Sequence, residues 1–190
     1  MRNLKLYSAV FLLDFGGTHT KAEAWRGSRK VFSIVVPTSP VLTGPNGERT
    51  IDPGNFAQHV KSVYQVLVDR VGPPDLVAIT GQMASQIIVA SDGTPTSPII
   101  SWQDQRALSR RFEETMHSLK HLTDDLNDFG YERWDGLRPG LPLIYLSSIL
   151  RSGLKTQNAR LLSLNQFAVL VINPSMNPMD IPIHSSEAAA

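Results

Sequence analysis

Cysteine is absent from the 190 residues of this chain, which excludes disulfide bonds, thiolate catalysis and cysteine-ligated zinc. An excess of charge of one sign is also lacking. The chain has 18 Lys and Arg against 17 Asp and Glu, a formal net charge of +1. We therefore expect no nucleic-acid partner and no attraction to an anionic membrane surface. The five histidines show no spacing typical of metal ligands, so none is assigned to a metal site.

Long hydrophobic runs are missing as well. The apolar stretch Leu6–Leu13 is too short to span a bilayer, and an aspartate follows it directly. No small-residue cleavage site follows this stretch, so a buried strand is a better interpretation than a signal peptide. We expect a cytoplasmic protein without a membrane partner.

The composition, 42% hydrophobic and 18% charged, suits a globular domain with a real core. Apolar runs bounded by Gly and Pro predict strands at residues 7–15, 22–25, 30–36, 76–80, 86–90 and 98–102. Apolar residues at helical spacing predict helices at residues 53–71, 103–119 and 142–153. Residues 37–54 look like a loop, and residues 161–172 fit either a helix or a strand. The pattern indicates a mixed α/β domain.

The segment from Asp14 to Lys21 is the most informative part of the chain, reading Asp-Phe-Gly-Gly-Thr-His-Thr-Lys after a predicted strand. Gly16 and Gly17 would let backbone N–H groups approach phosphate oxygens and form an anion-binding nest. Asp14 could hold Mg²⁺ directly or through its waters, since hard cations prefer carboxylate oxygens. Thr18 and Lys21 add a hydroxyl and a positive charge. The segment predicts a phosphate and magnesium turn, although an ordinary β-turn also fits.

Two further segments follow in order. Ile79–Met83 reads Ile-Thr-Gly-Gln-Met, and Pro98–Arg106 reads Pro-Ile-Ile-Ser-Trp-Gln-Asp-Gln-Arg. Together with the glycine turn they resemble the N-terminal half of the FGGY family of carbohydrate kinases, the relatives of xylulokinase and glycerol kinase. In that family the first strand ends in Asp-x-Gly-Thr-Ser/Thr-x-x-Lys. A later strand ends in Gly-Gln-Met-His-Gly, and a hairpin then leads to Trp-x-Asp-x-Arg. Order and spacing agree over residues 7–110.

The resemblance implies an actin-like (ribonuclease H-like) domain, with a mixed sheet flanked by helices, from an ATP-dependent phosphotransferase. ATP and Mg²⁺ would be the cofactors, and a sugar or polyol would be the substrate. Both a monomer and a homo-oligomer are compatible with the resemblance. Residues 1–190 would form an incomplete N-terminal domain without the C-terminal nucleotide-binding domain. The family's catalytic aspartate lies further along the chain than residue 190. We therefore expect these residues alone not to phosphorylate a sugar.

The resemblance also assigns roles in the sugar pocket. Gln82 and Met83 would line it, and Trp102 would pack against the carbon skeleton. Gln103 and Asp104 would bond hydroxyls or brace the strand end. A polyol needs fixed donors and acceptors beside one apolar wall, which an indole with neighbouring amide and carboxylate groups provides. Simpler roles also fit: Trp102 as core, Gln82 and Met83 as packing and turn, and Asp104 as the N-cap of a following helix.

The chain departs from the family pattern at several places. The turn reads Gly-Gly-Thr, and Ala84-Ser85 stand where the family often has His-Gly, which argues against a plain xylulokinase. Leu143 follows Pro142 where the family usually has a lysine. We expect Arg106 to be a structural partner of a nearby carboxylate. A non-catalytic sugar-binding module and an actin- or chaperone-type ATPase are the competing hypotheses, and the segments that contain Gln82 and Trp102 speak against the second.

Overall fold

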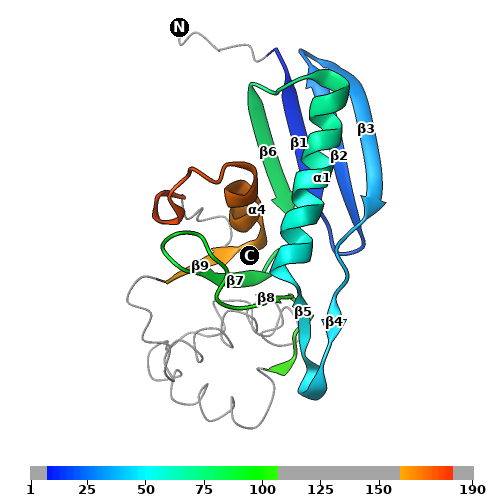
Figure 1. The fold of residues 1–190 in the computed structure, drawn as a ribbon. Coiled ribbons are helices and arrows are strands. Elements are labelled where there is room, and N and C mark those ends of the chain that lie inside the picture. The colour runs from blue at the N-terminus through cyan, green and yellow to red at the C-terminus, as the bar shows by residue number, and fades with distance from the viewer. Residues whose placement is uncertain (1–7, 107–158, 182–190) are drawn as a thin grey trace, which may run out of the picture.

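The computed structural model describes residues 8–106 and 159–181. Within these ranges the strands form two sheets, as Figure 1 shows. Most of the helix predicted at residues 103–119, and the whole helix predicted at 142–153, lie outside the described residues. Among the described helices, none combines the length and the apolar character needed to cross a membrane.

The first sheet is mixed, as the sequence predicts. Its strand order is β3-β2-β1-β6, with the bounds β1 (Val10–Phe15), β2 (His19–Arg26), β3 (Arg29–Pro37) and β6 (Leu76–Gly81). Strands β1, β2 and β3 form an antiparallel meander, and β6 pairs with β1 in parallel. The parallel pairing requires a crossover connection, and helix α1 (Pro53–Val71) supplies it.

Helix α1 begins and ends where the sequence predicts. The carboxylate of Asp52 accepts a hydrogen bond of 2.7 Å from the N–H of Asn55, and Pro53 occupies the first turn. Gly72, with φ of 85°, ends the helix in a backbone conformation that favours glycine.

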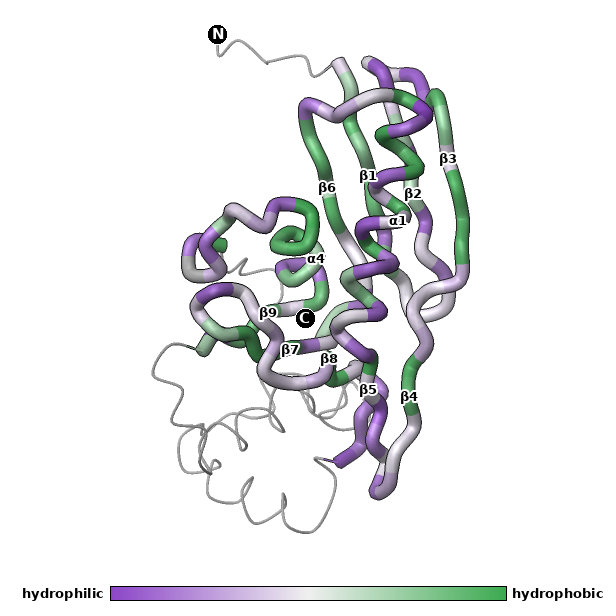
Figure 2. Tube along the Cα trace, viewed as in Figure 1, coloured by the Kyte–Doolittle hydropathy of each residue, from purple (hydrophilic) through white to green (hydrophobic). Residues whose placement is uncertain are grey.

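The core of the domain lies between α1 and the sheet. Figure 2 shows apolar residues along β1 and alternating apolar and polar residues along α1. The residues buried on the two sides include Phe11, Leu13, Phe15, Phe56, Val60, Val63 and Leu67. The rings of Phe15 and Phe56 meet edge to face with 5.5 Å between centroids. The end of β1, where the glycine turn begins, is thus held by packing against α1.

The second sheet is antiparallel and has the strand order β4-β5-β8-β7-β9. Its strands are β4 (Leu42–Thr43), β5 (Arg49–Ile51), β7 (Gln86–Val89), β8 (Ile99–Ile100) and β9 (Arg160–Ser163). The prediction of a loop over residues 37–54 was therefore wrong at β4 and β5. These strands are two and three residues long and are separated by the short 3-10 turn Pro45–Gly47, so they show no alternation of their own. Strand β5 acquires strand geometry because it pairs with β8, which lies far along the chain.

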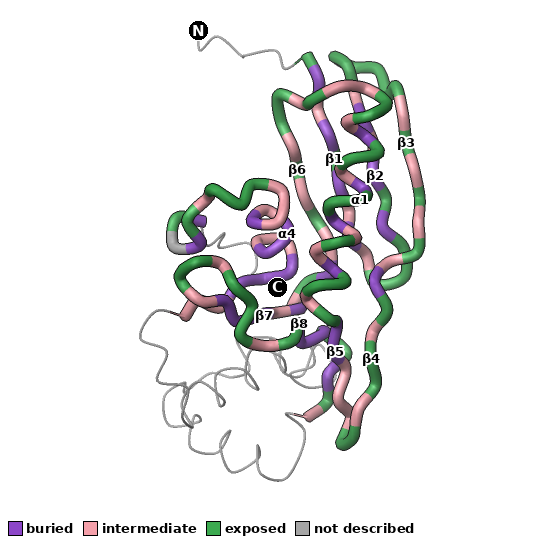
Figure 3. Tube along the Cα trace, viewed as in Figure 1, coloured by how far each residue is buried: buried purple, intermediate pink, exposed green. Residues whose placement is uncertain are grey.

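The ambiguous segment 161–172 divides into two elements. Its first residues belong to β9, which pairs with β7, and the rest form helix α4 (Leu164–Ile172). The boundary is a capping box at Ser163 and Gln166, in which each side chain bonds the backbone N–H of the other residue. Figure 3 shows β7 and much of α4 as buried, and Phe167 stacks against Phe56 at 6.1 Å between centroids. A short 3-10 turn, Pro178–Asp180, follows.

Candidate functional site

The glycine turn connects β1 to β2. Strand β2 begins at His19, so the turn itself consists of Gly16, Gly17 and Thr18. A Cβ on Gly16 would lie 2.8 Å from the carbonyl oxygen of His19, a distance that no side chain tolerates. The carbonyl of Thr18 accepts a hydrogen bond of 3.1 Å from the N–H of Thr38, which anchors the turn. Gly16 is thus required by the close approach of the backbone within the turn.

Asp14, Lys21 and Thr80 form a row across three neighbouring strands. Asp14 is the register partner of Lys21 on β2 and of Thr80 on β6, so the three side chains share one face of the sheet. Lys21 and Thr80 are exposed and Asp14 is half-buried. Within residues 8–106 and 159–181, the carboxylate of Asp14 makes no hydrogen bond or ion pair. An uncommitted carboxylate beside a lysine fits a metal and phosphate ligand. Among the described residues, no three acidic, His or Cys side chains are grouped so that they could hold a metal ion, so phosphate oxygens and waters would have to complete a Mg²⁺ shell.

Gln82 connects the second segment to the turn. Its N–H donates to the carbonyl of Phe15 at 3.0 Å, which continues the pairing of β6 with β1. Its side-chain Nε2 donates to the carbonyl of Gly16 at 3.1 Å. Gly81 permits this approach, because a Cβ there would lie 2.7 Å from the oxygen of Phe15. Gln82 is buried, so its amide is held in a fixed position beneath the glycine turn.

Trp102 brings the third segment to the same place. A Cβ placed on Gly17 would lie 3.9 Å from the indole nitrogen of Trp102, which is ordinary van der Waals contact. The Trp102 side chain is 43% exposed, and that of Met83 is 64% exposed. Such exposure does not fit a core role for either residue, and it leaves both able to contact a ligand. Gln103 is exposed too.

Asp104 differs from these neighbours, because it is only 1% exposed. Its carboxylate accepts hydrogen bonds from the N–H of Arg49 at 2.8 Å and from the N–H and Nε of Arg106 at 3.0 Å. Arg106 also pairs with Glu48 at 2.7 Å. The expected structural role of Arg106 is confirmed. Of the roles expected for Asp104, the bond from Arg49 supports bracing of the strand end, and the bond from the N–H of Arg106, two residues on, is of the kind that an N-cap aspartate accepts.

Two further residues, to which the sequence analysis assigned no role, lie next to the predicted site residues or the turn. Ser85 is fully buried between Gln82 and Trp102, and its hydroxyl bonds both. Nε2 of His59, on α1, lies 2.8 Å from the hydroxyl oxygen of Thr20, which is the first buried residue after the turn. Burial lowers the pKa of His59 below its ordinary value of 6.5. The helical pattern places His59 on α1, but only the tertiary structure brings it to Thr20.

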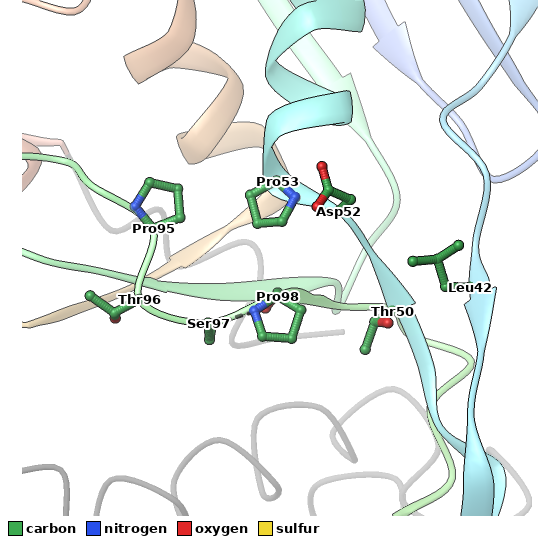
Figure 4. A pocket seen from close by; sticks show the side chains of 8 residues that line it. All are labelled: Leu42, Thr50, Asp52, Pro53, Pro95, Thr96, Ser97 and Pro98. Atoms are coloured by element: carbon green, nitrogen blue, oxygen red, sulfur yellow. Dashed lines mark hydrogen bonds between the residues drawn. The ribbon is translucent and has the colours of Figure 1, made fainter.

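A separate hollow of about 390 Å³ opens near the start of α1, as Figure 4 shows. Strands β4 and β5, the first turn of α1 and the β7–β8 connection contribute its walls, which consist of Leu42, Thr50, Asp52, Pro53, Pro95, Thr96, Ser97 and Pro98. None of these residues is among those predicted for the phosphate turn or the sugar pocket.

Solved structures with this fold include several sugar and polyol kinases. A xylulose kinase from Rhodospirillum rubrum matches with a TM-score of 0.64 at 17% identity, covering 95% of this chain and 40% of that one. Glycerol kinase from Plasmodium falciparum, solved with ADP, matches with a TM-score of 0.60 at 14% identity, over 95% of this chain and 40% of that one. Gluconate kinase from Lactobacillus acidophilus matches with a TM-score of 0.60 at 17% identity, over 86% of this chain and 33% of that one.

No family model matches the sequence, and no curated protein matches it. The structural likeness therefore establishes the fold, which is the actin-like α/β fold of the FGGY carbohydrate kinases. The resemblance inferred from the three segments is confirmed at this level. The chain spans between 33% and 40% of the length of these three kinases.

Proposed function

We propose that this chain supplies the phosphate turn and part of the sugar pocket of an ATP-dependent kinase that phosphorylates a hydroxyl of a sugar or polyol. The observation that carries the proposal is the meeting of three distant segments at one place. The amide of Gln82 bonds Gly16 at 3.1 Å, and the indole of Trp102 lies beside Gly17. A phosphate-binding turn next to a partly exposed indole is the juxtaposition that phosphoryl transfer to a polyol needs.

The phosphate side of the site would be formed by β1, the turn and β2. The exposed backbone of Gly17 and Thr18 would face phosphate oxygens, and Lys21 would add positive charge. Asp14 would hold Mg²⁺ together with those oxygens, and the metal would neutralise charge on the phosphates of ATP.

The sugar side would be formed by residues that follow β6 and β8. The indole of Trp102 offers an apolar wall, and Met83 offers a flexible one. Gln103, whose side chain has no bond among the described residues, would bond hydroxyl groups of the substrate. Asp104 would act through the backbone, because its carboxylate is already held by Arg49 and Arg106.

The group that activates the acceptor hydroxyl is assigned to no residue of this chain. We place it, with most of the adenosine site, in the part of the matched kinases that this chain does not cover, since it spans 33–40% of their length. Phosphoryl transfer depends on positioning and charge neutralisation by both sides of a closed cleft. The 190 residues alone would therefore bind a sugar without turning it over.

Sugar-dependent ADP release by the native polypeptide from its own cells tests this proposal, after its intact mass has been compared with 21.0 kDa. We expect a heavier polypeptide that releases ADP only with a ketose or polyol present, and a Trp102→Ala variant with a raised KM for that sugar. ADP release that ignores every sugar would instead indicate an ATPase. A native mass of 21.0 kDa with sugar binding but no turnover would favour the second candidate, a non-catalytic sugar-binding module.

A further inference from the structure

Ser85 is a polar residue with no exposed surface, placed between the second and third segments. Its hydroxyl donates to Oε1 of Gln82 at 3.1 Å and accepts from the N–H of Trp102 at 3.1 Å. Its carbonyl oxygen accepts from the N–H of Leu164 at 2.9 Å, which also fixes it to the start of α4. A single side chain thus touches both parts of the candidate sugar pocket.

Only one arrangement of donors and acceptors gives every polar group around Ser85 a hydrogen-bond partner. Nε2 of Gln82 donates to the carbonyl of Gly16, so the amide turns its oxygen toward Ser85. The N–H of Trp102 can only donate, so the hydroxyl proton of Ser85 must point to Gln82. Reversing the amide would set its oxygen against the carbonyl of Gly16. The three hydrogen bonds therefore form one chain, called the relay below, in which Trp102 donates to Ser85, Ser85 to Gln82 and Gln82 to Gly16 of the glycine turn.

The backbone just before Ser85 is held in an unfavourable conformation. Ala84 has φ of 60°, in the left-handed region that residues with a Cβ avoid. Such a conformation persists only where surrounding contacts determine it, and it is enriched at functional sites. The bonds of Ser85, the next residue, fix the chain immediately after Ala84.

We propose that Ser85 is a positioning residue of the sugar pocket, which sets the amide of Gln82 and the backbone of Trp102 in register with the glycine turn. The inference rests on the proposed function. Ser85 does not touch the substrate; it acts by holding the backbone that carries the Trp102 indole and the Gln82 amide beneath the turn. Its loss would leave the N–H of Trp102 and the oxygen of Gln82 without their partner in a buried place, so both groups would become mobile.

The test compares Ser85→Ala and Ser85→Thr with Ser39→Ala in this chain. Ser39 is a matched control, because it is buried and its hydroxyl has no hydrogen-bond partner among the described residues. The first readout, taken without ligand, is hydrogen exchange at the amide of Trp102. We expect slow exchange in the unmodified chain, at least about tenfold faster exchange in Ser85→Ala, and no change in Ser39→Ala. Ser85→Thr keeps a hydroxyl and should restore slow exchange.

The second readout is the Kd for D-xylulose or glycerol, followed by Trp fluorescence. We expect Ser85→Ala to raise Kd at least about tenfold, and Ser85→Thr to recover most of that loss. Rapid exchange at Trp102 in the unmodified chain would overturn the proposal even if no variant folds. So would a Ser85→Ala protein with faster exchange but an unchanged Kd. If the unmodified chain binds neither these probes nor any other ketose or polyol of a panel, the proposed function fails, while the exchange difference still decides whether the relay exists.

Discussion

Nε2 of Gln82 donates a hydrogen bond of 3.1 Å to the carbonyl oxygen of Gly16, across a separation of 66 residues in the chain. The bond ties the end of β6 to the turn after β1. Because β1 and β6 are parallel neighbours, their carboxyl ends lie at the same edge of the sheet. In open sheets with parallel strands this edge is where ligands bind. The position of the candidate site thus follows from the topology.

The two glycines of the turn should respond differently to alanine. Gly16→Ala places a Cβ 2.8 Å from a backbone oxygen, which the chain can relieve only by moving, so we expect a loss of about 2 kcal/mol of unfolding free energy. Gly17→Ala meets nothing closer than 3.9 Å and should change stability by less than about 0.5 kcal/mol. Urea unfolding of both variants checks this. Equal losses would show that the turn is not shaped as described.

Asp104 should contribute to stability far more than an exposed aspartate. Asp104→Ala leaves the guanidinium of Arg106 and the N–H of Arg49 without their buried acceptor, so we expect a loss of about 3 kcal/mol. Asp69→Ala, which removes only an exposed bond from Gln65, is the control and should cost less than about 0.5 kcal/mol. Denaturant midpoints at equal m-values measure the difference. A loss below about 1 kcal/mol for Asp104→Ala would contradict a bracing role.

Ala84→Gly should not destabilise the protein, although Ala→Gly substitutions usually do. Glycine removes the cost of a left-handed backbone, about 1–2 kcal/mol, and adds about 0.5–1 kcal/mol of unfolded-state entropy. We expect a change between zero and a gain of about 1.5 kcal/mol. Ala57→Gly within α1 is the matched control and should lose about 1 kcal/mol. Thermal unfolding followed by circular dichroism compares them; similar losses would refute the assigned conformation.

His59 should make stability depend on pH. Burial lowers its pKa in the folded protein below the ordinary 6.5, because the imidazolium is disfavoured next to Thr20 and Phe15. Near pH 6.5 the unfolded chain therefore binds more protons than the folded one. Stability is present above this pH and falls as the pH drops below it.

Urea unfolding at about pH 7.5 and about pH 5.5 measures this dependence, which should shrink in His59→Gln. His19→Gln is the control, because His19 is exposed. An unchanged pH dependence in His59→Gln would rule out the buried histidine as its source.

The sequence predicted the parts of the fold that local patterns determine. Helix α1 was found to the residue at both ends, because Asp52, Pro53 and Gly72 are strong local signals. Strands β4 and β5 were missed, since their few residues acquire strand geometry only by pairing, β4 with β5 and β5 with β8. Segment 161–172 stayed ambiguous because an apolar run shows no period, and the capping box at Ser163 resolves it.

For the candidate site, the sequence singled out three segments that the structure brings together, but it did not separate the structural roles of the residues within them. The resemblance named Trp102, Gln103 and Asp104 together, yet one is a half-exposed indole and another a buried brace. Ser85 looked like a mere departure from a pattern, because a hydrogen bond between its side chain and a distant backbone N–H leaves no trace in the local sequence. Burial and hydrogen-bond partners, which depend on the whole fold, separate such roles.

The proposed sugar pocket can be probed by titrating the isotopically labelled chain with a panel of ketoses and polyols, followed by amide and indole NMR resonances. We expect saturable shifts for at least one polyol that appear together at Gly17, Met83 and the indole of Trp102, and that are lost in Trp102→Ala. Absence of shifts with every compound, or shifts confined to the hollow around Thr96 and Ser97, would contradict the proposed pocket.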